Sequence, residues 1–81
     1  MAPTFYEEFG RRVARRRAML RLKQREVGAA IGVARSHVSA LEHGRQHLMD
    51  LAALRALAQV LQTSSDYLVQ VVDQDPGVIP D

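Results

Sequence analysis

Residues 24–42, QREVGAAIGVARSHVSALE, decide the fold of this chain. Val27 and Ile31 are four positions apart, so they lie on one face of a first short helix. Gly32 follows them, at a point where the chain must turn sharply and a positive φ is least costly for glycine. The stretch therefore predicts a short helix that ends in a tight turn.

A second helix follows the turn and carries its apolar residues on one side only. Val38 and Leu41, three positions apart, form its inward face, and Val33 is the apolar residue of the turn. Gly28 in the first helix has no side chain, which allows another helix to cross closely. The outward face of the second helix has polar or small side chains that can enter a groove without a clash: Arg35, Ser36, His37, Ser39 and Ala40.

The spacing of these residues resembles the helix-turn-helix of the Cro and phage-repressor (Xre-type) family of DNA-binding regulators. The resemblance covers about residues 9–69, and Gly44-Arg45 after Glu42 fits the family's E-x-G-[KR] ending. The other matched positions are Gln24, Val27, Gly28, Ile31, Gly32, Val33, Val38 and Leu41. An ordinary helical hairpin with a glycine turn is the alternative. The resemblance implies an all-α, compact five-helix, lambda-repressor-like domain over residues 1–72, followed by a tail over 73–81.

Composition supports a small helical domain and excludes several classes of protein. Leu, Ala and Val are abundant and only 5% of the residues are aromatic, which favours helices over a β-sandwich. The chain has no cysteine, so it has neither a disulfide framework nor a thiolate zinc site. No apolar run approaches the roughly 18 residues of a membrane span, and the N-terminus lacks a signal-peptide core. We therefore expect a soluble intracellular protein, and the resemblance implies a cytoplasmic, nucleoid-associated protein of bacterial or phage type.

Charge is distributed unevenly along the chain, although the net charge is only +2. Residues 1–45 contain ten Lys or Arg and four Glu, which gives +6, whereas residues 46–81 contain one Arg and five Asp, which gives −4. Such an asymmetry suggests one face for a polyanion and another face with a different role. A solvated basic helix face is the alternative, and the motif favours nucleic acid over it.

Capping signals predict two helices that flank the motif. Thr4 and Glu7 have the S/T-x-x-E spacing of a capping box and predict a helix over about residues 5–21. Asp50 is a good N-cap for a fourth helix. The apolar stripe of that fourth helix is expected to close the core over the motif, and it comprises Leu51, Leu54, Leu57, Ala58 and Leu61.

A fifth helix is predicted over about residues 65–72, capped by Ser64 and with Leu68 in the core. It is more apolar than a short exterior helix needs, and in the resembling family the last helix often makes a two-fold dimer contact. The predicted dimer contacts are therefore Tyr67, Val71 and Val72, with simple coverage of the core as the alternative. Pro76-Gly77 and Pro80 predict a frayed tail, whose Val78 and Ile79 are weaker candidates for docking on the partner subunit.

Arginines are crowded near the end of the first helix, where like charges repel one another. In the resembling family, an arginine at the position of Arg17 pairs with the glutamate that ends the recognition helix, here Glu42. We predict a salt bridge between Arg17 and Glu42 that is at least partly buried. Two independent surface charges are the alternative.

The resemblance also assigns roles in DNA binding by position. Arg35 and Ser36 match positions that reach base edges, and arginine can bond both acceptors of a guanine. Ala40 matches another reading position and can contact a thymine methyl, while Ser39 is a further base-reading candidate. Gln24 stands at a helix N-terminus, where anions are favoured, and can donate to a phosphate unless it is only a helix-terminal residue. The other phosphate-binding candidates are Lys23, Arg25, Arg45, His37 and Arg16.

Two features of the sequence depart from the family pattern. Ala34 occupies a position where the family usually has Ser or Thr, which removes a hydroxyl that could cap the recognition helix. The loop after Arg45 lacks the family's usual proline. His43 and His47 in this region are four apart, but the glycine between them and the lack of a third ligand argue against a metal site. Loop packing or phosphate contact is the role expected for them.

The predicted function is that of a sequence-specific duplex-DNA-binding transcriptional regulator. It acts as a homodimer on an inverted-repeat operator, with a recognition helix over about residues 35–42 in the major groove. The alternative is an antitoxin- or adaptor-type interaction module, whose acidic half binds a protein partner and for which DNA is secondary. We expect no enzymatic activity and no cofactor, because the sequence has no cysteine nucleophile, P-loop or nucleophile elbow.

Overall fold

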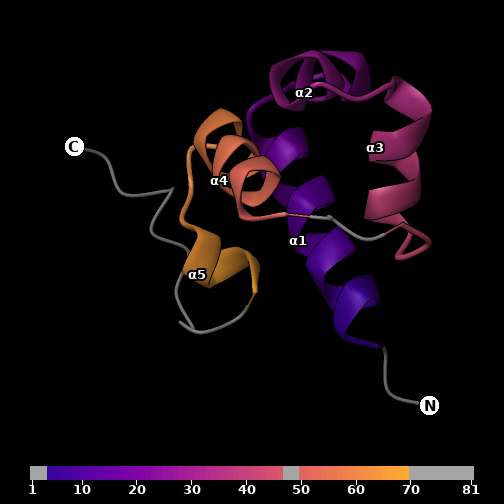
Figure 1. Cartoon of the computed structure of the whole chain (residues 1–81), viewed down its shortest axis with the longest axis vertical. Helices are drawn as coiled ribbons and strands as arrows, with labels where there is room; N and C mark the ends of the chain where they lie inside the picture. Colours follow the sequence, from indigo (N-terminus) through magenta and orange to yellow (C-terminus); the bar gives the residue numbers. More distant parts are fainter. Residues whose placement is uncertain (1–3, 47–49, 70–81) are drawn as a thin grey trace.

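Five α-helices, and no strand, are present in residues 4–46 and 50–69, which are the residues that this computed structural model describes (Figure 1). The helices are α1 (Phe5–Met19), α2 (Gln24–Ile31), α3 (Arg35–Glu42), α4 (Leu51–Val60) and α5 (Ser65–Leu68). The predicted all-α fold with five helices is confirmed.

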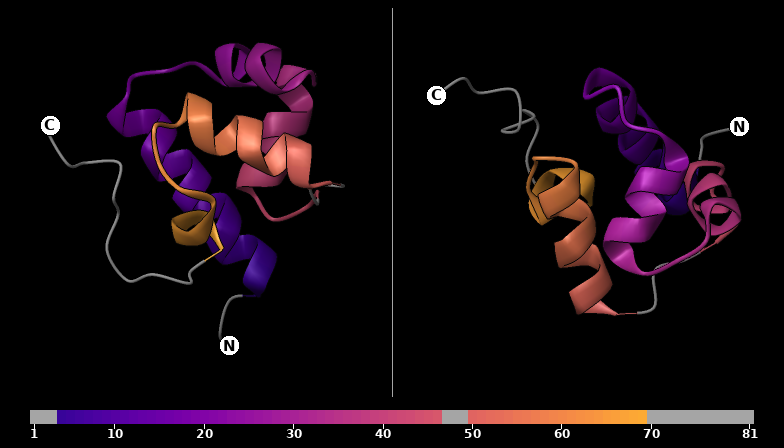
Figure 2. Two further views of the ribbon diagram at one scale, coloured as in Figure 1. Left: turned by 60° about the vertical axis from the view of Figure 1, so that its left-hand side comes forward. Right: turned by 90° about the horizontal axis from the view of Figure 1, so that it is seen from above.

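The long helix α1 is a main packing partner of two other helices. Helices α3 and α5 both pack against α1 and lie on opposite sides of it, while α2 packs across α3 and α4 (Figure 1, Figure 2). One side of α3 is thereby buried against α1 and α2, and its other side is left at the surface.

The core is built from the apolar faces that the sequence pattern indicates. Its buried members are Phe9, Val13, Val27, Val38, Leu41, Leu57, Ala58, Leu61, Tyr67 and Leu68. Two predictions about which residues are buried are wrong. Leu51, placed in the buried stripe of α4, is 82% exposed, and Tyr67, placed at a dimer surface, is only 6% exposed and covers the core. The other two predicted dimer contacts, Val71 and Val72, lie outside the described residues.

Three helices begin with the caps predicted from the sequence. The Thr4 N–H donates to the Glu7 carboxylate at 2.7 Å, and the Glu7 N–H donates to the Thr4 hydroxyl at 3.1 Å, which completes the capping box of α1. Asp50 accepts from the Ala53 N–H at 2.7 Å. Ser64 likewise accepts from the N–H three residues further on, at 3.0 Å, and so begins α5.

Two helices end earlier than the sequence predicts. Helix α1 stops at Met19 because Arg21 adopts a left-handed backbone with φ 57°, and the Leu22 N–H turns back to the Arg17 carbonyl at 3.0 Å. Helix α5 ends at Leu68, with Val69 as its C-cap, so its predicted continuation through Val69 is wrong. Residues 70–81, including the predicted tail with Val78 and Ile79, lie outside the described residues.

Glycine allows close backbone approach at two places in this fold. The sequence predicts that another helix crosses closely at Gly28, but the close neighbour there is the turn before α3. A Cβ at Gly28 would lie 2.6 Å from the Val33 carbonyl oxygen. The close crossing of helices occurs at Gly10 instead, where α1 meets the backbone of α3. Gly32 has the predicted positive φ, 79°, between α2 and α3.

Candidate nucleic-acid interface

Helix α3 spans Arg35–Glu42, the range predicted for the recognition helix. Val38 and Leu41 are fully buried and hold its inner side against the core. Arg35 and Ser36 are exposed at its N-terminal end, and Ser39 and Ala40 are partly exposed further along. The four predicted base-reading side chains therefore all have access to the surface.

A chain of hydrogen bonds ties both ends of α3 to α1 and α2. Arg17 donates to both carboxylate oxygens of Glu42, from Nε at 2.5 Å and from Nη2 at 3.1 Å. The Gln24 amide donates to Glu42 Oε1 at 3.0 Å, and Arg35 Nη1 donates to Gln24 Oε1 at 3.2 Å. The predicted Arg17–Glu42 salt bridge is present, and the Glu42 side chain is only 5% exposed.

The side chain of Gln24 therefore has a role that the sequence does not indicate. It is the first residue of α2, and a helix N-terminus favours an anion. Its amide also lies between the carboxylate that ends α3 and the arginine that begins α3. Through these two bonds Gln24 orients the Arg35 side chain relative to the core.

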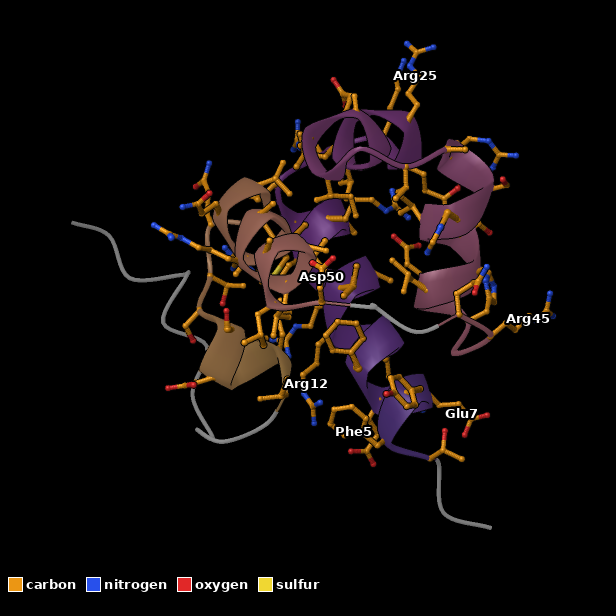
Figure 3. The ribbon with its side chains drawn as sticks, in the orientation of Figure 1. Phe5, Glu7, Arg12, Arg25, Arg45 and Asp50 are labelled. Carbon is orange, nitrogen blue, oxygen red and sulfur yellow. The ribbon has the colours of Figure 1, made fainter. Side chains whose placement is uncertain are left out.

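Cationic side chains surround the two ends of the α2–α3 unit. Lys23 precedes α2 and Arg25 lies in its first turn, while Arg45 follows α3, and all three are exposed. Figure 3 shows Arg25 and Arg45 pointing outward from the body of the domain at these two places. The exposed side of α3 thus lies between positive charges that can attract a polyanion.

Comparisons with known proteins identify this arrangement. A sequence model of the helix-turn-helix domain family matches residues 8–70. The chain belongs to this family. A comparison with curated protein sequences gives no significant match.

Solved structures with this helix-turn-helix fold include three regulators. The P22 c2 repressor protein, in complex with a synthetic operator, is 33% identical, with a TM-score of 0.68 over 74% of this chain and 89% of that chain. The clp gene regulator ClgR from C. glutamicum is 25% identical, with a TM-score of 0.75 and coverages of 85% and 88%. The restriction-modification controller protein C.AhdI from Aeromonas hydrophila is 27% identical, with a TM-score of 0.70 and coverages of 78% and 90%. The fold is that of Xre/Cro-type helix-turn-helix regulators.

One predicted phosphate contact of this helix-turn-helix domain needs correction. Arg16 is 1% exposed, and its guanidinium donates to the carbonyls of Leu61 at 3.1 Å and Gln62 at 3.0 Å. It therefore caps the negative C-terminal end of α4 and does not face a ligand. His37 is partly buried, and its Nε2 is buried without a hydrogen-bond partner in the described residues, so the predicted phosphate contact of this residue stays a prediction for Nδ1.

His43, for which the sequence predicts loop packing or a phosphate contact, is exposed. Its Nδ1 lies 2.8 Å from the Ser39 carbonyl oxygen. Since a carbonyl can only accept, Nδ1 carries the hydrogen and donates it, and Nε2 is the nitrogen left for another partner. The seven-residue spacing from Ser36 to His43 is the signal that puts both on the exposed side of α3.

The start of α3 lacks a side-chain cap. Ala34 has the extended N-cap backbone, φ −74° and ψ 158°, but no side-chain oxygen to accept from the first turn. The first N–H groups of α3, beside Arg35 and Ser36, are thus available to a ligand or to water.

The electrostatics of the buried pair keep Arg17 charged. Its hydrogen bond to Glu42 raises the Arg17 pKa, partial burial lowers it, and the Glu42 charge raises it further, with a net upward shift.

Among the residues described, no group of three His, Cys, Asp or Glu is placed to hold a metal ion, and His47 lies outside them. No described helix is long and apolar enough to cross a membrane.

Proposed function

We propose that this protein binds duplex DNA sequence-specifically as a homodimer and regulates transcription, without enzymatic activity. In this proposal α3 enters the major groove, and Arg35, Ser36, Ser39 and Ala40 contact base edges. The observation that carries the proposal is the exposed, cation-flanked face of α3. The 33%-identical P22 c2 repressor, whose structure contains a synthetic operator, supports it.

Phosphate contacts come from the residues around the two ends of the motif. Gln24, Lys23 and Arg25 lie at the N-terminus of α2, and Arg45 follows α3. Contacts of this kind set the register and the affinity of the protein on DNA, while base contacts set sequence preference. In a two-fold dimer, two copies of α3 meet half-sites about one helical turn, ~34 Å, apart.

An exposed apolar groove supports a second copy of this chain as the dimer partner. The groove has a volume of about 280 Å³, and its apolar walls are Phe5, Tyr6, Phe9, Leu51, Leu54 and Val69. Leu51 is 82% exposed and Phe5 is 51% exposed, and Figure 3 shows Phe5 at the foot of α1, away from α3. A two-fold axis brings one patch against itself, so Leu51 of each copy can fill the groove of the other while α3 remains open.

Leu51→Glu is expected to convert the protein to a monomer, because the charged side chain would be buried in the dimer without a partner. Sedimentation equilibrium over a range of concentrations measures the change. Gln59→Glu is the matched control, since it places the same side chain at an exposed position of α4 that does not line the groove. A Leu51→Glu protein that dimerises as strongly as the unchanged chain would exclude this groove as the interface.

Arg35→Ala is expected to relax the base preference at one position of each half-site. The loss of a bidentate contact lowers discrimination there by about 1–3 kcal/mol, with little change in the salt dependence of binding. Arg25→Ala removes the same charge from α2 and is expected to weaken binding to all sequences and to reduce the salt slope by about one. Competition binding against single-base operator variants measures both effects. Indistinguishable profiles would contradict these assignments.

Selection of bound duplexes from a random pool, at near-physiological salt, tests the proposed function directly. Enrichment of an inverted repeat, with half-site centres about one turn apart, is the expected result. Binding without enrichment would leave only the counterion-release contribution to affinity. In that case sequence-specific regulation would be wrong, and an interaction with a protein partner would become the better explanation.

A further inference from the structure

Four of the five arginines of α1 divide into two groups by their surroundings. Arg16 and Arg17 are held by carbonyls of α4 and by Glu42 of α3. Arg11 and Arg15, in contrast, are exposed. Together with Glu8, Arg12 and Tyr67 they line an open groove of about 300 Å³ between α1 and α5. Three positive side chains and one negative side chain line this groove, which we call the α1 basic groove.

The α1 basic groove lies away from the proposed DNA interface. Gly10 and Arg17 mark the side of α1 that meets α3, and Arg12 marks the side that meets α5. At about 100° per residue, Arg11 and Arg15 fall between these sides, on the outward surface of the helix. Their charge is therefore not used by the contacts proposed for α2 and α3.

The C-terminal part of the chain begins beside this groove. Tyr67 lines it, and the Leu68 carbonyl accepts from Arg12 Nη1 at 3.3 Å. Residues 70–81 follow and contain Asp73, Asp75 and Asp81 but no lysine or arginine. Asp73 is four residues beyond Val69, and four extended residues span up to about 14 Å, so its carboxylate can reach the groove.

We propose that Asp73 and Asp75 of the same chain bind in the α1 basic groove and neutralise Arg11 and Arg15. Exposed ion pairs are individually weak, so a free acidic peptide would occupy such a groove poorly. A segment that is tethered next to the groove has a high effective concentration and occupies it without a large intrinsic affinity. The acidic C-terminal half of the sequence would thereby contact the basic N-terminal half.

This contact has a consequence that rests on the proposed function. An uncovered arginine face on α1 would attract phosphates in any sequence and orientation, because binding through counterion release is independent of sequence. Neutralising it leaves the α2–α3 surface as the main cationic surface open to DNA. The acidic segment would then favour operator binding over non-specific binding.

The docking itself is tested without DNA, on the full chain, by NMR of the arginine side chains. At low ionic strength, Asp73→Asn with Asp75→Asn is expected to shift the Nε–Hε signals of Arg11 and Arg15 and to speed their exchange with water. Asp66→Asn, which removes an exposed charge from α5 outside the groove, is the control and should leave them in place. The signal of Arg25, on α2, should not move in any variant.

Two outcomes of this experiment would overturn the inference. The first is that the Arg11 and Arg15 signals are the same with and without the two aspartates. The second is that the aspartate-dependent shift disappears on dilution, because the segment would then be bound to another copy. Neither outcome bears on whether α3 binds DNA, so this inference and the proposed function can fail separately.

The consequence for DNA is measured with a duplex that lacks an operator. At low salt the Asp73→Asn, Asp75→Asn protein is expected to bind it about two- to fivefold more tightly, and raising the salt should remove the difference. The gain should also disappear when Arg11→Gln and Arg15→Gln are added. A gain that persists without the two arginines would show that the aspartates act through general charge and not through the α1 basic groove.

Discussion

Replacing Gly10 by alanine is expected to destabilise the fold by about 3 kcal/mol or more, because the added methyl has no room. A Cβ at Gly10 would lie 2.2 Å from the Leu41 carbonyl oxygen and 2.7 Å from the Glu42 carbonyl oxygen. Both atoms belong to the backbone of α3, so no side-chain rotation relieves the overlap. Helix α3 must move away from α1 or the domain must unfold.

Urea denaturation followed by circular dichroism measures this change. In an unconstrained helix, alanine in place of glycine is worth about 1 kcal/mol in the stabilising direction. Ala18→Gly, at an exposed position of the same helix, is the matched control and should cost only about that amount. A Gly10→Ala protein as stable as the unchanged chain would mean that α1 and α3 do not cross as closely as the structure has them.

The sequence predicts those features that depend on neighbouring residues. The caps formed by Thr4, Asp50 and Ser64 each use a side chain and an N–H group three residues away, so short-range spacing is sufficient to find them. The inward faces of α2 and α3 follow from helical periodicity in the same way. The Arg17–Glu42 pair is a long-range contact, and it comes from the family resemblance rather than from local pattern.

Features that depend on packing between distant segments are the ones that the sequence does not predict. Arg16 and Arg17 are adjacent in a run of arginines, and only the position of the α4 C-terminus explains why one caps a helix and the other meets Glu42. Gly10 has no sequence signal at all, because its role is to leave space for the α3 backbone. The periodicity of α4 likewise places Leu51 in the apolar stripe. It does not show that the core covers only part of this stripe and leaves Leu51 exposed.

The candidate DNA-binding residues divide in the same way. Arg35, Ser36 and Gln24 are placed by their position in the motif, which fixes the direction of short helices joined by a defined turn. The bond from Arg35 to Gln24 is a property of two side chains eleven residues apart and requires the structure. His37 is on a helix with an exposed face, but its rotamer turns Nε2 inward.

Replacing Glu42 by alanine is expected to cost about 3 kcal/mol, because it leaves Arg17 without the charge that compensates its partial burial. The Glu42 side chain is 5% exposed and accepts two hydrogen bonds from Arg17 and one from Gln24. The loss should persist at high salt, because ions screen buried pairs much less than exposed ones. Glu26→Ala is the control. It removes an exposed carboxylate that accepts from the Lys23 N–H and should cost about 1 kcal/mol or less.

The direction of the Arg17 pKa shift defines how this stabilisation depends on pH. A cation whose pKa is raised by folding contributes stability that is fully present below its unfolded pKa and is lost as the pH rises through its folded pKa. For arginine both values are strongly alkaline. Raising the pH from neutral to moderately alkaline should therefore not remove the Arg17 contribution.

A Glu42→Ala protein with an unchanged midpoint of unfolding would refute the role assigned to the pair.

A double replacement separates the contribution of this pair to stability from its contribution to DNA reading. Arg17→Met with Glu42→Leu removes both charges and is expected to recover much of the stability lost in Glu42→Ala, because apolar side chains of similar volume can replace a buried ion pair. It also removes the acceptor that holds the Gln24 amide, which in turn accepts from Arg35. The recovered protein should still show a weakened base preference at the Arg35 position. Full recovery of both stability and preference would mean that Gln24 positions Arg35 without help from Glu42.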